Sequence, residues 1–453
     1  MKNNILKKIL KKKKEWIHYN KIANPISSFK NNIIKSDRNF YSNLKKEYPA
    51  YILECKKYSP SHGLLRNKFD LPKITNIYKK YASAISVVTD EEFFKGSFKN
   101  LLLVRNNVHQ PVLCKDFIID KYQIYLARYY KADAILLMLS ILNDAQYIYL
   151  SNIAKKLNMG ILTEIYDINE MHRAQNLKAK VIGINNRNLN DLNINIQNTQ
   201  KIAPLISKKT IIISESGINS FKQIKKLRKM VHGFLIGSYL MKKKNIDHAI
   251  KRLIFGNNKI CGLTNTQDAI CSEKNGAIYG GLILCKNSPR KININKAKKI
   301  ISNTNLKHVA VFQNNTARYI INVCKKINLY AIQLHGNETQ EYINNIRRNI
   351  SSKIKIWKSI PIINSFPNLK FIHVKKYIFD NIIGGSGNTF NWSILKNKKI
   401  NNIFIAGGLN IDNCKIALKF DCFGLDFNSG IESIPGIKSE KKIQKIFKIL
   451  RTF

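Results

Sequence analysis

Acidic residues are scarce in this chain of 453 residues, which has 28 Asp and Glu against 77 Lys and Arg and a formal net charge of +49. Such an imbalance is typical of proteins that bind nucleic acid or anionic membranes. Asn and Ile are enriched together with Lys, as in residues 188–196, and all three have A/T-rich codons. Because a polyanion-binding surface would enrich only Lys and Arg, the composition favours mutational bias over such a surface.

Long apolar runs and paired cysteines are also lacking. No segment approaches the roughly 18 apolar residues that cross a bilayer, and no apolar run or cleavage site follows the Lys-rich start. That start instead predicts an amphipathic helix with Ile5, Leu10, Trp16 and Ile17 toward the core. The eight cysteines form no CxxC pair and show no metal-ligand spacing. We therefore expect reduced thiols, a cytoplasmic location and no metal site.

Short Val/Ile/Leu/Ala runs alternate with helical stretches through the first half of the chain. They occupy residues 51–53, 85–88, 111–114, 134–137, 160–162, 181–184, 211–213 and 233–236. Buried strands that alternate with helices predict a parallel sheet closed into a barrel.

The same pattern restarts near residue 261. Its strand-like runs are 259–261, 278–282, 308–312, 331–334, 354–357, 377–379, 403–406 and 423–427. Two large barrels fill a chain of this length. We therefore predict an α/β fold of two consecutive (βα)8 TIM barrels, residues 1–255 and 256–453. A helix within 241–258 that ends at Gly256 would join them.

Polar residues gather where the strands of the first half end, which is where (βα)8 barrels carry their chemistry. They are Glu54, Lys56, Ser59, Lys115, Glu164, Asn185, Arg187, Glu215, Ser216, Gly217, Gly237 and Ser238. Lys115 and Glu164 in a partly desolvated barrel mouth can serve as proton donor and acceptor. Small residues after the last two strands let backbone N–H groups approach a phosphate. A lone strand-end lysine is more often a surface charge, but here six strand ends carry such groups.

The strand ends of the second half carry a different set of residues. They are Cys261, Arg290, His335, Asp380, Gly407, Gly408, Asn428 and Ser429. The thiol of Cys261 and the carboxylate of Asp380 follow nearly opposite strands, so they can face each other across a substrate as base and acid. A thiol with a pKa of about 8.5 needs a cationic neighbour or a helix terminus to ionise at neutral pH. A single buried cysteine is more often a small hydrophobe.

Motifs in the first half include Ile-Leu-Glu-Cys-Lys-Lys-Tyr-Ser-Pro-Ser at 52–61, with others at 88–98, 111–117, 162–164, 183–189 and 213–218. From about residue 20 to 245 the chain resembles indole-3-glycerol phosphate synthase. The resemblance implies that Lys115 protonates the substrate carbonyl and that Glu164 serves the later dehydration. Lys56 would hold anionic groups and assist proton transfer, with Glu54 setting its charge or acting only as a buried ion-pair partner. Asn185, Arg187 and Glu215 would line the anthranilate side, and Ser59, Ser216, Gly217, Gly237 and Ser238 the phosphate.

Motifs in the second half include Ile-Cys-Gly-Leu-Thr at 260–264, with others at 288–290, 333–338, 384–392, 406–409 and 424–429. Residues 258–453 resemble phosphoribosylanthranilate isomerase. The resemblance implies that Asp380 protonates the furanose oxygen and Cys261 removes the C2' proton, without metal or organic cofactor. Ile382 and Ile383 beside Asp380 would raise its pKa, which suits an acid. Arg290 would clamp the anthranilate carboxylate, with Gln333 and His335 nearby, and Gly385, Ser386, Gly387, Gly407, Gly408, Asn428 and Ser429 would hold the phosphate.

Together the two resemblances imply a bifunctional enzyme of tryptophan biosynthesis, because the product of the second half is the substrate of the first. Its partners would be small phosphorylated and carboxylated substrates, without nucleic acid or membrane, and the chain would be a monomer. Two alternatives stay open. One is the same fold with one decayed site. The other is a basic nucleic-acid-binding protein on a barrel scaffold, which lacks the clustered basic and aromatic modules of that class.

Overall fold

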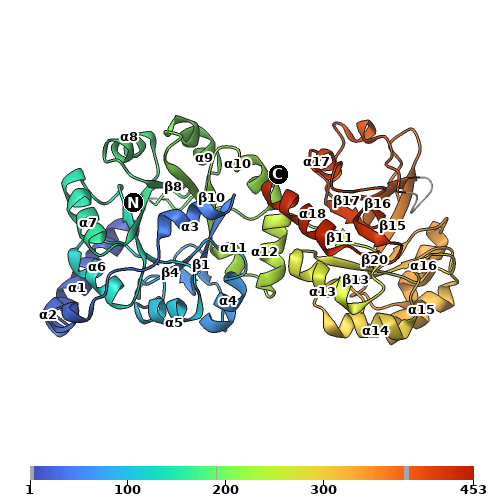
Figure 1. The fold of residues 1–453 in the computed structure, drawn as a ribbon, viewed down its shortest axis with the longest axis horizontal. Helices are drawn as coiled ribbons and strands as arrows, with labels where there is room; N and C mark the ends of the chain where they lie inside the picture. The colour runs from blue at the N-terminus through green and yellow to red at the C-terminus, as the bar shows by residue number, and fades with distance from the viewer. Residues whose placement is uncertain (1–4, 190, 382–386) are drawn as a thin grey trace. The chain divides into compact units, whose positions relative to one another are not determined.

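The computed structural model describes residues 5–189, 191–381 and 387–453. The chain divides into two compact units, Met1–Ile250 and Lys251–Phe453. Figure 1 shows a ring of helices around a closed set of strands in each unit. The predicted boundary between residues 255 and 256 lies at the end of α12 (Ile246–Phe255), where Gly256 has a φ of 84°.

The N-terminal unit is a closed barrel of eight strands, and each strand pairs in parallel with its neighbours. The strands are β1 (Ala50–Cys55), β4 (Ala84–Val88), β5 (Val112–Lys115), β6 (Ala134–Met138), β7 (Gly160–Ile165), β8 (Val181–Asn185), β9 (Ile211–Glu215) and β10 (Gly233–Ile236). All are almost fully buried because one face fills the barrel and the other meets the helices. The predicted strands and their order are confirmed.

Helices follow the strands around this barrel. They are α4 (Leu71–Tyr78), α5 (Lys99–Asn107), α6 (Lys121–Tyr129), α7 (Asp144–Lys156), α8 (Ile168–Asn176), α9 (Gln197–Ile202) with η2 (Ala203–Leu205), α10 (Phe221–Leu227) and α11 (Ser238–Met241), then α12. Capping boxes start α6, α7 and α10, where Asp120, Asn143 and Ser220 are paired with a Gln three residues on. A short hairpin of β2 (Tyr58–Ser59) and β3 (Gly63–Leu64) follows β1.

An N-terminal extension precedes the first barrel strand. It contains α1 (Ile5–Ala23), α2 (Ile26–Phe29), η1 (Lys30–Asn32) and α3 (Phe40–Lys46). The predicted helix is confirmed, but its buried side chains are Ile9, Lys13 and Ile17, while Leu10 is only half-buried. The side chain of Phe40 on α3 packs against Gly160 of β7, where a Cβ would collide with it.

The C-terminal unit is a second closed barrel of eight parallel strands. The strands are β11 (Lys259–Ile260), β12 (Tyr279–Ile283), β13 (Lys307–Phe312), β14 (Ala331–Leu334), β15 (Lys355–Ile362), β16 (Val374–Asn381), β17 (Ile403–Ile405) and β18 (Gly424–Phe427). These strands are confirmed as well. The ring of Trp357 lies 5.1 Å from that of Phe404 and 5.2 Å from that of Tyr279, so aromatic side chains fill much of this core.

Several connections of the second barrel are shorter than their counterparts in the first. Its helices are α13 (Thr266–Asn275), α14 (Ile294–Asn303), α15 (Ala317–Lys326), α16 (Gln340–Asn349), η3 (Trp392–Leu395), α17 (Cys414–Ala417), η4 (Ser429–Ile431) and α18 (Glu440–Thr452). Residues 363–373 join β15 to β16 without a helix. A hairpin of β19 (Glu432–Ile434) and β20 (Ile437–Lys438) follows β18.

Candidate active sites

The carboxyl ends of the N-terminal barrel strands enclose a cavity of about 320 Å³, a size that suits a small ligand. Its lining includes Glu54, Lys56, Lys115, Glu164, Asn185, Arg187, Glu215, Ser216, Gly217, Gly237 and Ser238. Ser59 lines an adjoining cavity. Lys56, Arg187 and Ser238 also line it, as do Ile5 and Ile9 of α1. The structure therefore brings all the predicted residues of the first half to one barrel mouth.

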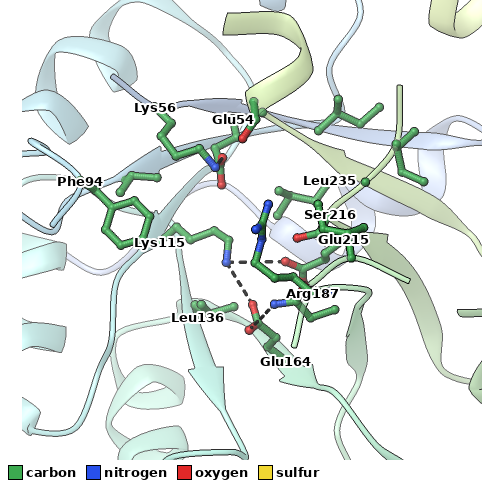
Figure 2. Close-up of a pocket in the computed structure, with 18 of the residues that line it drawn as sticks. Glu54, Lys56, Phe94, Lys115, Leu136, Glu164, Arg187, Glu215, Ser216 and Leu235 are labelled. Atoms are coloured by element: carbon green, nitrogen blue, oxygen red, sulfur yellow. Dashed lines mark hydrogen bonds and ion pairs between the residues drawn. The ribbon is translucent and has the colours of Figure 1, made fainter. Parts of the chain in front are cut away.

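Lys115 lies among carboxylates at the centre of this cavity (Figure 2). Its Nζ is 3.0 Å from Oε2 of Glu164 and 3.6 Å from Oε2 of Glu215. Burial lowers the pKa of Lys115, but Glu164, Glu215 and Glu54 outweigh it and raise the pKa above its ordinary value. Asn185 donates from Nδ2 to Oε1 of Glu164, at 3.0 Å, which fixes that carboxylate. Lys115 is thus a charged proton donor in contact with an oriented carboxylate.

Glu215 differs from the other carboxylates of the cavity. Burial, with Glu164 and Glu54 nearby, raises the pKa of Glu215 to about 8, although Lys115 opposes the shift. In the described part of the chain, its buried Oε1 has no hydrogen-bond partner. That oxygen lies in the space of a Cβ at Gly183, so a larger residue there would displace the carboxyl group of Glu215. The raised pKa favours the protonated form of Glu215, which can donate a hydrogen bond.

Glu54 and Lys56 form an ion pair on β1 and the turn after it. Nζ of Lys56 is 2.6 Å from Oε1 of Glu54. Burial raises the pKa of Glu54, but Lys56 and Lys115 outweigh it and hold the pKa below its ordinary value. Glu54 is therefore an anion that keeps Lys56 at the cavity wall (Figure 2).

Left-handed backbone follows β9, at the edge of the cavity where small residues were predicted. Ser216 has a φ of 64° and Gly217 a φ of 79°. Gly237 precedes the first turn of α11, and a Cβ there would collide with the carboxylate of Glu54. Consecutive turns of this kind expose backbone N–H groups, which suit an anion.

A buried lysine on α1 supports this site and was missed by the sequence analysis. Nζ of Lys13 lies 2.7 Å from Oδ2 of Asp90 and 2.7 Å from Oδ1 of Asp116, and all three side chains are almost fully buried. Asp116 follows Lys115 directly and also accepts from Oγ1 of Thr89, at 2.7 Å. Lys13 stands in a run of lysines that reads as a solvated face, and nothing in that run marks the buried position.

The second barrel has a cavity of about 430 Å³ at the same end of its strands. Its lining includes Cys261, Arg290, Gln333, His335, Asp380, Gly407, Gly408, Asn428 and Ser429. Gly387 is not in contact with the cavity itself, but its carbonyl oxygen would collide with a Cβ at Gly408. Gly385, Ser386, Ile382 and Ile383 lie outside the described residues.

Asp380 is the next-to-last residue of β16 and lies beside Gln333 of β14 and His335, which follows β14. Burial raises the pKa of Asp380 to about 6, and Asp426 adds to the shift. His335 places Nε2 at 3.7 Å from Oδ2 of Asp380, and its Nδ1 is 3.1 Å from Nε2 of Gln333. Burial lowers the pKa of His335 to about 4. A neutral His335 that accepts from Gln333 at Nδ1 presents an N–H to Asp380.

Arg290 is already engaged by a carboxylate of the protein. Its Nε donates to Oε1 of Glu432 at 2.9 Å, and its Nη2 donates to Oε2 at 2.8 Å. Nζ of Lys438 lies 2.7 Å from the same Oε1. Burial raises the pKa of Glu432, but Arg290 and Lys438 outweigh it and lower the pKa below its ordinary value. This network holds the guanidinium through Nε and Nη2, so Nη1 can bind a ligand. Arg290 was predicted from the sequence, but Glu432 was not.

Glycines shape the remaining wall of the second cavity. Gly407 has a φ of 78° and Gly408 a φ of 57°, so both lie in the left-handed region. Asn428, at the start of η4, accepts from Nζ of Lys438 at 2.9 Å through its Oδ1.

In the described ranges, no group of three or more His, Cys, Asp or Glu could hold a metal ion. Likewise, no described helix is long and apolar enough to cross a membrane.

Two (βα)8 barrels with buried acid and base side chains at the carboxyl ends of their strands define a pair of barrel enzymes on one chain. Residues 6–253 match the family model "Indole-3-glycerol phosphate synthase", and residues 258–449 match "N-(5'phosphoribosyl)anthranilate (PRA) isomerase". The chain is 56% identical to the "Tryptophan biosynthesis protein TrpCF" of Buchnera aphidicola subsp. Schizaphis graminum, over 99% of this chain and 100% of the relative. It is 48% identical to the TrpCF protein of Salmonella typhi, over 99% of each chain.

The chain therefore belongs to the TrpCF family of bifunctional tryptophan biosynthesis proteins, which join a synthase barrel to an isomerase barrel. The predicted family and the two predicted enzyme classes are confirmed.

Proposed function

We propose that the two cavities catalyse consecutive reactions and that the residues predicted from the sequence perform them. The C-terminal barrel would isomerise N-(5'-phosphoribosyl)anthranilate to 1-(2-carboxyphenylamino)-1-deoxyribulose 5-phosphate. The N-terminal barrel would convert that product to indole-3-glycerol phosphate, with loss of CO2 and water. The observation that carries the proposal is the presence of a different acid and base pair in each barrel mouth.

In the isomerase, the carboxylic acid of Asp380 gives its proton to the furanose ring oxygen. The C1'–O bond breaks, and the lone pair of the anthranilate nitrogen forms a C=N bond. The thiolate of Cys261 then takes the C2' proton, and the C–H electron pair forms the enolamine that tautomerises to the ketone. The raised pKa of Asp380, about 6, supports its role as acid.

The substrate of the isomerase carries a carboxylate and a phosphate, and the second cavity offers a partner for each. Arg290 would bind the carboxylate through Nη1, because Glu432 occupies its other edge. Left-handed backbone at Gly407 and Gly408 supports phosphate binding there, with Gly387, Asn428 and Ser429 beside it. Gln333 and His335 would hold Asp380 and the sugar in place, and Gly385 and Ser386 stay predictions.

In the synthase, Lys115 would protonate the substrate carbonyl oxygen while the aromatic carbon that bears the carboxylate attacks the carbonyl carbon. That attack closes the five-membered ring, loss of CO2 restores the aromatic ring, and loss of water forms the double bond that completes the pyrrole. Glu164 would act as acid or base in that dehydration, and its 3.0 Å contact with Lys115 supports proton exchange between the two. Lys56, which pairs with Glu54, would hold the anionic groups and assist proton transfer.

The other residues of the first cavity would hold the substrate. Asn185, Arg187 and Glu215 would line the anthranilate and hydroxyl side. The phosphate would lie against the turns after β9 and β10, where backbone N–H groups are exposed. Its ligands would be Ser59, Ser216, Gly217, Gly237 and Ser238.

The test is to assay each reaction separately, with its own substrate, on Lys115→Ala and Cys261→Ala. We expect Lys115→Ala to lose only the synthase reaction and Cys261→Ala to lose only the isomerase reaction. Each variant is its own folding control, because the untouched reaction reports on the same chain. Loss of both reactions in either folded variant would refute two independent sites, and a reaction absent from the wild type would show that one site has decayed.

We also infer that the chain acts as a monomer in the cytoplasm, without nucleic acid or membrane partners. The free thiols of Cys261 and Cys285 inside the isomerase cavity support a reducing compartment. Light scattering on the purified chain gives its mass, for which we expect 52.2 kDa. Filter binding at physiological salt tests for nucleic acid, and tight retention would revive the polyanion alternative.

A further inference from the structure

A fully buried lysine lies two residues before the proposed base of the isomerase and has no part in the mechanism above. Lys259 on β11 has no exposed surface, and its Nζ is 2.7 Å from Oδ2 of Asp426 on β18. The two residues are register partners in neighbouring strands. Taking an ammonium group out of water is costly even when it is paired, so the charge of Lys259 is a candidate for a functional role.

The side chains of Lys259 and Cys261 run next to each other inside the barrel. Alternate residues of a strand point to the same side, so these two share the inner face of β11 and its continuation. A Cβ at Gly281, on the adjacent strand β12, would lie 2.6 Å from Sγ of Cys261 and 3.1 Å from Cε of Lys259. The absence of a side chain at Gly281 therefore lets the thiol and the end of the lysine chain fill one space.

We propose that Lys259 is a positioning residue for the isomerase, a fixed cation that stabilises the single negative charge which Cys261 holds before proton transfer and Asp380 holds after it. The proposal rests on the acid and base roles given above. It adds a third side chain, which neither gives a proton to the substrate nor takes one from it.

The proton balance of the reaction explains why one fixed cation can stabilise the negative charge first on Cys261 and then on Asp380. The reactive enzyme has a thiolate at Cys261 and a carboxylic acid at Asp380. After the step it has a thiol and a carboxylate, so its net charge is unchanged while the negative charge has moved across the barrel. A buried cation that acts on both groups stabilises the start and the end of this transfer without any movement of solvent.

The electrostatics around the thiol agree with this role. Burial raises the pKa of Cys261 above its ordinary value, Lys259 opposes that shift, Asp426 adds to it and Lys438 opposes it. Cys285 and Arg290 face the same thiol. Lys259 also lowers the pKa of Asp380, against burial and Asp426. Among these groups Lys259 has the largest effect on Cys261 after burial.

The test measures the thiol directly, by the pH dependence of iodoacetamide alkylation at Cys261, with peptide mass spectrometry to separate it from Cys285. Replacing Lys259 by Met removes the charge at similar volume. We expect the alkylation rate at pH 7.5 to fall about tenfold for each unit by which the thiol pKa rises. The kcat of the isomerase should fall at least about tenfold, with KM changed less than about threefold and the synthase reaction unaffected.

Lys358→Met is the matched control. Lys358 is also a buried lysine of this barrel, paired at 3.0 Å with Glu338, but it has no resolved effect on Cys261. Lys358→Met should destabilise the barrel about as much as Lys259→Met does and leave the pKa of the Cys261 thiol unchanged. Asp426→Asn should move the thiol pKa in the opposite direction, downward, because Asp426 raises it. A purely structural role of Lys259 predicts no shift of the thiol pKa in Lys259→Met.

If Lys259→Met does not fold, the double variant Lys259→Met/Asp426→Asn is compared with Asp426→Asn, because these two variants differ only at Lys259. An unchanged thiol titration between Lys259→Met and the wild type, or between the double variant and Asp426→Asn, overturns the proposal. Its failure is separable from failure of the proposed function. If Cys261→Ala is inactive but Lys259→Met titrates like the wild type, only the role of Lys259 is wrong. If Cys261→Ala keeps full isomerase activity, the assignment of the base itself is wrong.

Discussion

Replacing Lys13 by Met should destabilise the N-terminal barrel strongly. The ammonium of Lys13 is 2.7 Å from Asp90 and 2.7 Å from Asp116, and the three side chains are 5%, 4% and 0% exposed. The substitution removes the cation and leaves two carboxylates buried without it. Removing one partner of a buried pair typically costs about 3 to 5 kcal/mol. With a urea dependence of roughly 3 kcal/mol per molar, the unfolding midpoint should fall by roughly 1 M or more.

Lys12→Met is the matched control for Lys13→Met. Lys12 is the preceding residue on the same helix and pairs with Glu15, but both side chains are about half exposed, 48% and 51%. Exposed pairs contribute little to stability, so this variant should unfold with the wild type.

The assay follows loss of the synthase reaction with urea, and loss of the isomerase reaction in the same samples. Only the synthase midpoint should shift in Lys13→Met. Equal midpoints for the Lys12 and Lys13 variants would mean that burial makes no difference to the contribution of the ion pair.

The Lys13 pairs also have a defined pH dependence. Burial lowers the pKa of Lys13, but Asp116 and Asp90 outweigh it and raise the pKa above the ordinary value of 10.5. A raised lysine pKa gives stability that is fully present below the unfolded value and lost as the pH rises through the folded one. The midpoint difference between wild type and Lys13→Met should therefore stay constant at neutral pH and shrink only in strongly alkaline solution.

Two further predictions concern the isomerase. Glu432→Gln should raise KM about tenfold and leave kcat within about threefold, because Arg290 keeps its charge but loses its fixed orientation toward the substrate carboxylate. Steady-state kinetics test this, and an unchanged KM would mean that Glu432 does not orient Arg290. The pH profile of kcat/KM should fall below about pH 6, where Asp380 and Cys261 both hold protons, and again above the raised pKa of Cys261. A profile that is flat between pH 5 and 7 would contradict Asp380 as the acid.

The strands and the residues at their ends could be predicted because both depend on local pattern. Buried parallel strands are short apolar runs, and the barrel places whatever follows them at one mouth. Lys115, Glu164, Cys261 and Asp380 stand in such positions, and each lines its cavity.

Partners across a barrel could not be predicted, because no local pattern pairs residues so far apart. Arg290 and Glu432 are 142 positions apart, and Lys259 and Asp426 are 167 apart. The buried face of α1 was misjudged for a related reason. Its apolar residues suggested Leu10, but the helix turns Ile9 inward so that Lys13, one turn on, reaches Asp90 and Asp116.

We expect the two barrels to carry out consecutive steps with separate proton-transfer pairs. The most direct test supplies N-(5'-phosphoribosyl)anthranilate alone to the purified chain and follows all three compounds by chromatography. The wild type should form indole-3-glycerol phosphate and CO2. Cys261→Ala should leave the substrate unchanged, and Lys115→Ala should accumulate 1-(2-carboxyphenylamino)-1-deoxyribulose 5-phosphate. Mixing the two variants should restore the final product. If Lys115→Ala does not accumulate the intermediate, or if the mixture does not form the final product, the two barrels do not act as separate, consecutive sites.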